Sequence, residues 1–160
     1  MYNDKVLKIF ENPRNAGSLP GANGVGKVGN VKCGDIMKIF IKVDEKEGTI
    51  YDAKFKTFGC VSAIASTDTA CEMIKGKTLE QALKITNKDV IDALGGLPAV
   101  KIHCSVLAQE AIAAAVADYK KKVNRAANRA AKSKSTVKTK TTIKTTKVTT
   151  KTTSTKKIGM

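Results

Sequence analysis

Apolar and polar residues alternate along residues 35–58, and this period of two predicts a β-hairpin with one covered face. The turn falls at residues 44–48, a charged run that ends in glycine. The core-facing positions predicted for the two strands are Met37, Ile39, Ile41, Val43, Tyr51, Ala53, Phe55 and Thr57. A lone hairpin is marginal in water, so further elements must cover this face.

Elsewhere apolar residues recur every three to four positions, which predicts amphipathic helices. Thr78 with Gln81 predicts a capping box, and Thr86 repeats the device one helix later. The predicted helices span residues 2–11, 61–75, 78–85, 86–94 and 103–119, and alanine propensity extends the last toward residue 131.

A glycine-rich stretch, residues 17–29, separates the first predicted helix from the hairpin. Its five glycines and one proline predict a loop or a frayed edge of the sheet. Residues 24–29 match the pattern G-x-G-x-x-G, but no apolar strand precedes them and no helical pattern follows. The segment is therefore not expected to bind a nucleotide.

Charge divides the chain into two parts. Residues 1–119 hold fifteen basic and all fourteen acidic residues, whereas residues 120–160 hold fourteen basic residues and no acid. From about residue 133 the composition is mostly Lys, Thr and Ser, which buries too little apolar surface to offset chain entropy. We expect a folded domain over residues 1–131 and a disordered basic tail over residues 132–160. The tail either solubilises the protein or contacts a polyanion, nucleic acid or an acidic partner, without sequence preference.

The chain has 160 residues and a mass of 17.0 kDa, which suits one domain with an appendage. No apolar run approaches the roughly 18–20 residues of a membrane span, and the first residues lack a signal-peptide layout. We therefore expect a cytoplasmic protein with no membrane contact. Four cysteines are too few for a disulfide scaffold and are expected to be thiols. Cys71, on the apolar face of a predicted helix, is expected in the core.

The other three cysteines occupy positions suited to metal ligation or thiolate chemistry. Cys33 precedes Asp35 by two residues at the entry to a strand. Cys60 lies at a strand-to-helix corner, and Cys104 follows His103, the single histidine, at a helix start. Helix N-termini favour thiolates, so low thiol pKa values are expected. The set suits a tetrahedral Cys₃His or Cys₃Asp site, with small buried core residues as the alternative.

Three sequence blocks carry a more specific signal. They are GNVKCGDIMK at residues 29–38, FKTFGCVSAIAS at residues 55–66 and KIHCSVLA at residues 101–108. Together they resemble the signature blocks of the IscU/NifU family of iron–sulfur cluster assembly scaffolds, over roughly residues 1–120. The resemblance, with the periodicity, implies an α+β fold of the SufE/NifU-like type. That fold has a small antiparallel three-stranded sheet around residues 28–58, with helices packed on one face and the cysteines at one end.

The resemblance also implies roles for single residues. Cys33, Cys60 and Cys104 would bind a nascent [2Fe–2S] cluster, with Asp35 or His103 at the fourth position. In the cluster-free form the same residues would bind iron or zinc. Cys104 would accept persulfide sulfur from a cysteine desulfurase of the IscS/NifS type, and the cluster would pass to apo-proteins. The implied protein is a scaffold and not an enzyme, acting as a monomer or a homodimer.

Two departures from the family pattern change these expectations. The family usually has glycine after the second cysteine, whereas this chain has Val61, whose β-branched side chain resists positive φ and is expected to alter cluster access. The segment that an Hsp70-type chaperone recognises is typically Leu-Pro-Pro-Val-Lys. In this chain the segment consists of Leu97, Pro98, Ala99, Val100 and Lys101. One of the two prolines is missing, which makes chaperone docking less certain.

Two other classes of function compete with the scaffold. One is a zinc-dependent sulfur acceptor of the SufU type, but such proteins typically carry an insertion between the second and third cysteines and lack the histidine before the last one. The other is a nucleic-acid-binding protein that uses the tail, with incidental thiols in the body.

Overall fold

The computed structural model describes residues 1–31 and 34–146, so Cys33 lies outside the described residues. The chain divides into two units, Met1–Lys122 and Val123–Met160. Helix α5, Ile102–Thr146, continues across this boundary. The domain bounds expected from the sequence, residues 1–131 and 132–160, rest on composition and helix propensity and stay a prediction.

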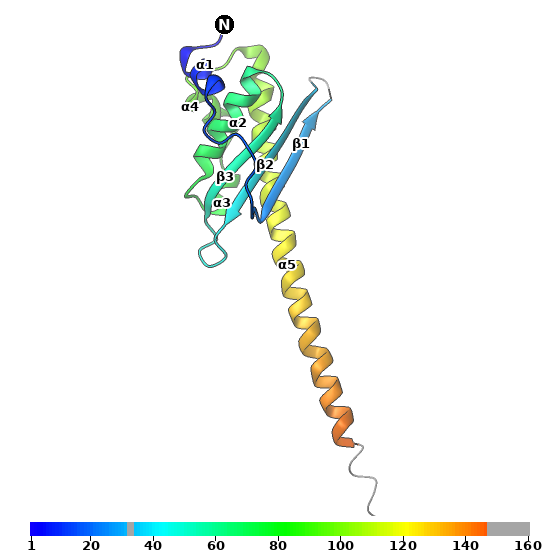
Figure 1. The fold of residues 1–160 in the computed structure, drawn as a ribbon. Coiled ribbons are helices and arrows are strands. Elements are labelled where there is room, and N and C mark those ends of the chain that lie inside the picture. Colours follow the sequence, from blue (N-terminus) through cyan, green and yellow to red (C-terminus); the bar gives the residue numbers. More distant parts are fainter. Residues whose placement is uncertain (32–33, 147–160) are drawn as a thin grey trace, which may run out of the picture. The chain divides into compact units, whose positions relative to one another are not determined.

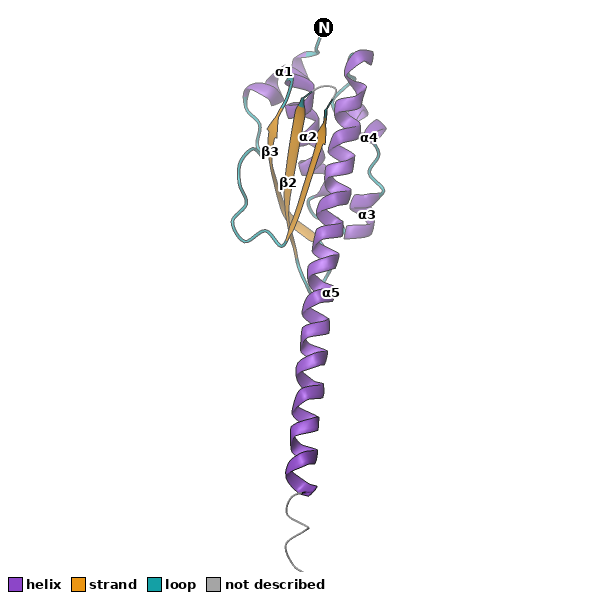
Figure 2. Ribbon diagram, turned by 90° about the vertical axis from the view of Figure 1, so that its right-hand side faces the viewer, coloured by secondary structure: helices purple, strands orange, loops and turns teal. Residues whose placement is uncertain are grey.

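The first unit is built on an antiparallel sheet in the order β1-β2-β3 (Figure 1). Its strands are β1 (Gly24–Asn30), β2 (Asp35–Val43) and β3 (Ile50–Phe58). Helices cover one face of this sheet (Figures 1 and 2). The α+β class and the three-stranded sheet are thus as predicted. The buried positions of β2 are Met37, Ile39, Ile41 and Val43, as the period of two required.

Strand β3 departs from the predicted alternation at its first two residues. Ala53 and Phe55 face the core as expected, but Tyr51 is 60% exposed and Ile50 is fully buried. The pairing register shifts at Lys42/Val43, where one extra residue of β3 enters the ladder. Such a bulge moves a residue to the opposite face, and a hydrophobic pattern alone does not reveal it.

Strand β1 occupies part of the stretch for which a loop or a frayed edge of the sheet was predicted. Its glycines are required because helix α5 lies directly on the strand. A Cβ at Gly26 would collide with the carbonyl of Ala111 and lie 2.5 Å from the amide nitrogen of Ala115. A Cβ at Gly24 would lie 2.8 Å from the Ala115 carbonyl. Glycine within a strand here marks a close approach of another backbone, and not a break in the sheet.

Side-chain caps begin several of the helices. Asn3 caps α1 (Asp4–Glu11), and its side-chain amide donates to the carbonyls of Leu94, Gly95 and Gly96, which ties α1 to the end of α4. The predicted Thr78–Gln81 capping box is present, and Thr86 forms a second one with Asp89. The other helices are α2 (Val61–Ile74), α3 (Leu79–Leu83), α4 (Asn87–Ala93) and the 3₁₀ turn η1 (Ala99–Lys101).

Within the first unit α5 is a core helix. Among the described residues, the stretch Ala99–Lys132 is long and apolar enough to cross a membrane, although no uninterrupted apolar run in the sequence suggests it. Its apolar side chains contribute to the core together with those of the sheet, which accounts for its hydropathy. The fully or almost fully buried ones are Leu107, Ala108, Ala111, Ile112, Ala115 and Val116.

The expectation of a disordered basic tail over residues 132–160 stays a prediction. Helix α5 continues to Thr146, while residues 147–160 lie outside the described part of the chain. Lengthening an existing helix adds one hydrogen bond per ordered residue without a new nucleation cost, and Ala and Lys are good helix formers.

We expect Gly26→Ala to destabilise the first unit by about 1–3 kcal/mol, the usual range for overpacking a core. The added methyl group meets backbone atoms of α5, which cannot rotate away as a side chain could. Urea unfolding of the purified variant measures the change. Gly29→Ala is the matched control, because its Cβ would have Asp35 O as nearest neighbour at 3.5 Å, an ordinary contact. Equal stability of the two variants would refute the close-approach argument.

Candidate metal centre

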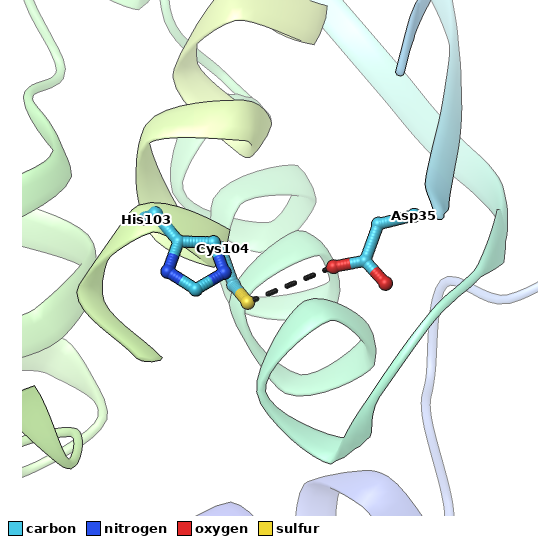
Figure 3. Close-up of side chains that lie close together, drawn as sticks. All are labelled: Asp35, His103 and Cys104. Atoms are coloured by element: carbon cyan, nitrogen blue, oxygen red, sulfur yellow. Dashed lines mark hydrogen bonds between the residues drawn. The ribbon is translucent and has the colours of Figure 1, made fainter. Parts of the chain in front are cut away.

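Three predicted site residues meet at one end of the sheet. Asp35 is the first residue of β2, Cys60 lies between β3 and α2, and Cys104 lies in the first turn of α5. The Sγ atoms of Cys60 and Cys104 are 3.6 Å apart. The Cys104 thiol also donates to Oδ2 of Asp35 at 3.8 Å, and Figure 3 shows the two side chains pointing toward each other. Residues from three separate elements therefore converge on one point.

His103 joins this group from the outer side. A ring nitrogen of His103, the Cys104 sulfur and an Asp35 oxygen all lie within 4.8 Å of one another (Figure 3). Asp35 and Cys104 are buried, whereas His103 is exposed. Both predicted candidates for the fourth ligand, Asp35 and His103, are thus adjacent to Cys104, one from the inside and one from the solvent side.

These separations suit a tetrahedral metal ion. Two thiolates bound at about 2.3 Å with tetrahedral angles have sulfur atoms about 3.8 Å apart. The observed 3.6 Å between Cys60 and Cys104 is close to this value before any ion is bound. Thiolate, imidazole and carboxylate ligands together favour zinc or iron over the hard cations that need oxygen alone.

Gly59 makes room for the carboxylate, a role that the sequence analysis missed. A Cβ at Gly59 would lie 3.0 Å from Oδ1 of Asp35 and 2.9 Å from the Cβ of Ala63. Any side chain there would push Asp35 away from Cys104 or α2 away from the sheet. A glycine directly before a corner cysteine was the available signal, because it marks a close approach.

The thiol of Cys104 is not the low-pKa group that its place at a helix start predicted. Burial, together with the smaller effects of the neighbouring Cys60 thiol and Asp35 carboxylate, raises the pKa of Cys104 to about 12, while Lys101 opposes them. The 3₁₀ turn η1 runs directly into α5, so the first free amide groups belong to earlier residues and not to Cys104. Without a cation, this thiol therefore remains protonated at neutral pH.

The other predicted residues lie around or away from the centre. Cys71 is fully buried in the core, and burial raises its pKa, which confirms its structural assignment. Val61 begins α2 in helical conformation, so the lost glycine imposes no strain there. In the predicted chaperone segment, Pro98 precedes the 3₁₀ turn, Leu97 packs on the core and Val100 is 75% exposed. The segment is a turn and not a fully extended strand.

The fold and the centre define a class: a small α+β protein that gathers thiols and a carboxylate at one end of an antiparallel sheet. Residues 1–126 match the model of the NifU-like N-terminal domain. The chain belongs to this family, which confirms the resemblance seen in its three sequence blocks.

Curated relatives extend the match. The chain is 57% identical over 122 residues to the iron–sulfur cluster assembly scaffold protein IscU 1 of Archaeoglobus fulgidus, covering 76% of this chain and 78% of the relative. It is 56% identical over 124 residues to the iron–sulfur cluster assembly scaffold protein IscU of Azotobacter vinelandii, covering 76% of this chain and 95% of the relative. Neither alignment covers the whole of this chain.

The fold is also similar to that of a solved structure. A scaffold protein for the SUF system from Fervidobacterium islandicum superposes with a TM-score of 0.59 at 23% identity, over 72% of this chain and 96% of that one. At this identity the likeness supports the fold alone.

The raised pKa of Cys104 predicts slow alkylation in the metal-free protein. A thiol with a pKa of about 12 is almost wholly protonated at pH 8, so its reaction with iodoacetamide should rise about tenfold per pH unit between pH 8 and 10. Asp35→Asn removes a negative charge beside the thiol and should speed the reaction at each pH. Peptide mass spectrometry measures modification of this cysteine. A rate that is flat across this pH range would contradict the raised pKa.

Proposed function

We propose that the protein is a scaffold on which a [2Fe–2S] cluster is assembled from iron and sulfur and from which it is transferred to apo-proteins. The observation that carries this proposal is the convergence of Cys60, Cys104 and Asp35 in a chain that belongs to the NifU-like family. Cys33, outside the described residues, is proposed as the third thiolate ligand because it lies two residues before Asp35. The scaffold holds its cargo and turns over no substrate of its own.

Sulfur enters through Cys104. Its thiolate attacks the outer sulfur of a persulfide on a cysteine desulfurase, a new S–S bond forms on Cys104, and the donor cysteine leaves as a thiolate. The raised pKa of Cys104 opposes this attack in the empty protein. A bound cation offsets the nearby Asp35 charge and favours the thiolate, so we propose that metal binding precedes sulfur acceptance.

The ligand set favours release. Asp35 offers oxygen and His103 offers nitrogen, and both bind iron less covalently than a fourth thiolate does. Asp35 is buried beside Cys104, so we propose it as the fourth ligand of the cluster, and the exposed His103 as the group that meets incoming donors. In the cluster-free form the same residues hold iron or zinc.

An apolar rim supports docking of partners at this end of the sheet. Phe58, which is 78% exposed, pairs with half-exposed Ile36, the neighbour of Asp35. Val100 and Ile102 are exposed on the chain just before His103. We propose that the cysteine desulfurase and the apo-protein acceptors contact this rim, in the cytoplasm. An Hsp70-type chaperone would use Leu97, Pro98, Val100 and Lys101.

The second candidate is a zinc-dependent sulfur acceptor of the SufU type. The 3.6 Å thiol pair accommodates zinc as readily as iron. The two functions differ in the species that Cys104 carries at the end: a cluster ligand in the scaffold and a persulfide in the sulfur carrier.

Anaerobic reconstitution with iron, cysteine and a desulfurase tests the scaffold. The wild type should gain sulfide-to-iron absorption, and Cys104→Ala should lose nearly all of it because one cluster ligand and the sulfur acceptor are removed. Cys71→Ala is the matched control, an equally buried cysteine outside the centre, and should reconstitute like the wild type. Retention of zinc with only a persulfide on Cys104 would instead establish the sulfur carrier.

Replacement of Asp35 tests the release role. Asp35→Ala should retain a reconstituted cluster several-fold longer than the wild type in transfer to an apo-ferredoxin, because the oxygen ligand that exchanges easily is gone. The decay of visible absorption and the gain of acceptor absorption measure the two rates. Asp44→Ala, in the hairpin turn, controls for loss of a carboxylate elsewhere. Faster cluster loss from Asp35→Ala would contradict the proposed role.

A further inference from the structure

A cavity of about 630 Å³ lies among helices α1, α2 and α4 of the first unit. Helix α1 packs beside α2 (Figure 1), and none of Asp35, Cys60, His103 and Cys104 lines the cavity. Cys60 caps the start of α2, and Asp68, which lines the cavity, lies about 12 Å farther along that helix by its rise per residue. The cavity is therefore separate from the candidate metal centre.

The cavity is lined by positive charge that has no partner. Lys5 and Lys8 lie one turn apart on α1, Arg14 follows in the loop after this helix, and all three are exposed. Within the described part of the chain, none of these three side chains forms an ion pair or a hydrogen bond. A concave surface lined by cations raises the local concentration of anions.

The two acids that line the cavity are already engaged by other groups. The backbone amide of Asn15 donates to Oδ1 of Asp68 at 2.7 Å. The side-chain amide of Asn15 donates to Oε2 of Glu72 at 3.1 Å, and Lys75 forms an ion pair with the same oxygen at 3.2 Å. The hydrogen bonds from Asn15 and Lys75 lower the pKa of Glu72, and Arg14 adds only a smaller electrostatic effect. The charge that remains without a partner is thus positive.

The cavity also has an apolar part. Ile9 and Met73 are partly buried against the core, and Ala93 lines the cavity from the end of α4. Cavities of about 300–1,000 Å³ typically take small organic molecules, with apolar walls for the body and a few polar groups that fix its orientation. A bare inorganic anion would leave this apolar surface uncovered.

We propose that this cavity binds a small organic anion that carries at least two negative charges, as phosphate or carboxylate groups, on a partly apolar body. Arg14 offers a planar fork that matches two oxygens of either group, while Lys5 and Lys8 act as point charges. Ile9 and Met73 contact the apolar body. This binding needs no cluster, so the proposal is independent of the scaffold function.

Amide NMR titration of the full chain with ADP and with citrate tests the proposal and locates the binding. At least one of the two should shift the amides of Ile9, Arg14 and Thr69 along one saturating curve, with a Kd below about 1 mM. The ligand that binds more tightly shows whether the charged groups are phosphates or carboxylates. Pyrophosphate, which carries charge without an apolar body, should bind at least about tenfold more weakly than that ligand.

Substitution of the lysines tests the charge. Lys5→Gln with Lys8→Gln should raise the Kd at least about tenfold, because two charge-assisted contacts are lost. Lys27→Gln with Lys56→Gln removes the same charge from two exposed lysines of the sheet that do not line the cavity, and this matched control should bind like the wild type. All four replaced side chains are exposed, so both variants should keep the wild-type amide spectrum in the absence of ligand.

Four results would each overturn the proposal. They are no saturable shift at the cavity amides with either ligand, shifts confined to residues after Lys122, equal weakening by the two lysine pairs, and pyrophosphate binding as tight as that of the organic anions.

Discussion

The contact between the backbones of α5 and β1 positions the candidate metal centre. Gly24 and Gly26 leave no side chain between strand and helix, and Asp118 accepts a hydrogen bond at 3.0 Å from the amide of Val25 farther along the same helix. Because a helix is rigid, fixing α5 against β1 also fixes the first turn of α5, which contains Cys104. The carboxylate of Asp35 comes from the adjacent strand, so the 3.8 Å between Cys104 and Asp35 follows from how helix and sheet are joined. Small residues that pack the two backbones together thus determine how the distant Cys104 thiol and Asp35 carboxylate lie relative to each other.

Local rules in the sequence were enough for the elements that local interactions stabilise. The alternation of β2, the capping threonines of α3 and α4 and the buried Cys71 were predictable because each depends on residues a few positions away or on a repeating apolar face. Strand β1 was not, because its glycines suit a partner more than eighty residues later in the chain. The bulge that exposes Tyr51 was hidden for a similar reason, since it belongs to the pairing of two strands and not to either strand alone.

The candidate metal centre shows the same limit in its chemistry. Its residue types and their order were readable, and the family blocks placed them together. The pKa of Cys104 could not be predicted from the sequence, because a helix start favours the thiolate while burial beside Cys60 and Asp35 disfavours it. Burial is the larger effect, since desolvation acts on the whole charge and the dipole contributes only partial charges at the first turn. That first turn is also displaced here by the 3₁₀ residues that precede it.

These electrostatics bear on how an empty centre behaves. Two thiolates 3.6 Å apart, with a carboxylate 3.8 Å from one of them, would place several negative charges in a partly dry space, which is costly without a cation. The empty centre avoids that cost by keeping Cys104 protonated, and a cation removes it by releasing the proton. Affinity for the cation then includes the cost of deprotonation, which weakens binding relative to a site made of thiolates already formed. A centre that is stable both when empty and when filled lets its cargo arrive and leave without unfolding the sheet and helices that hold the ligands.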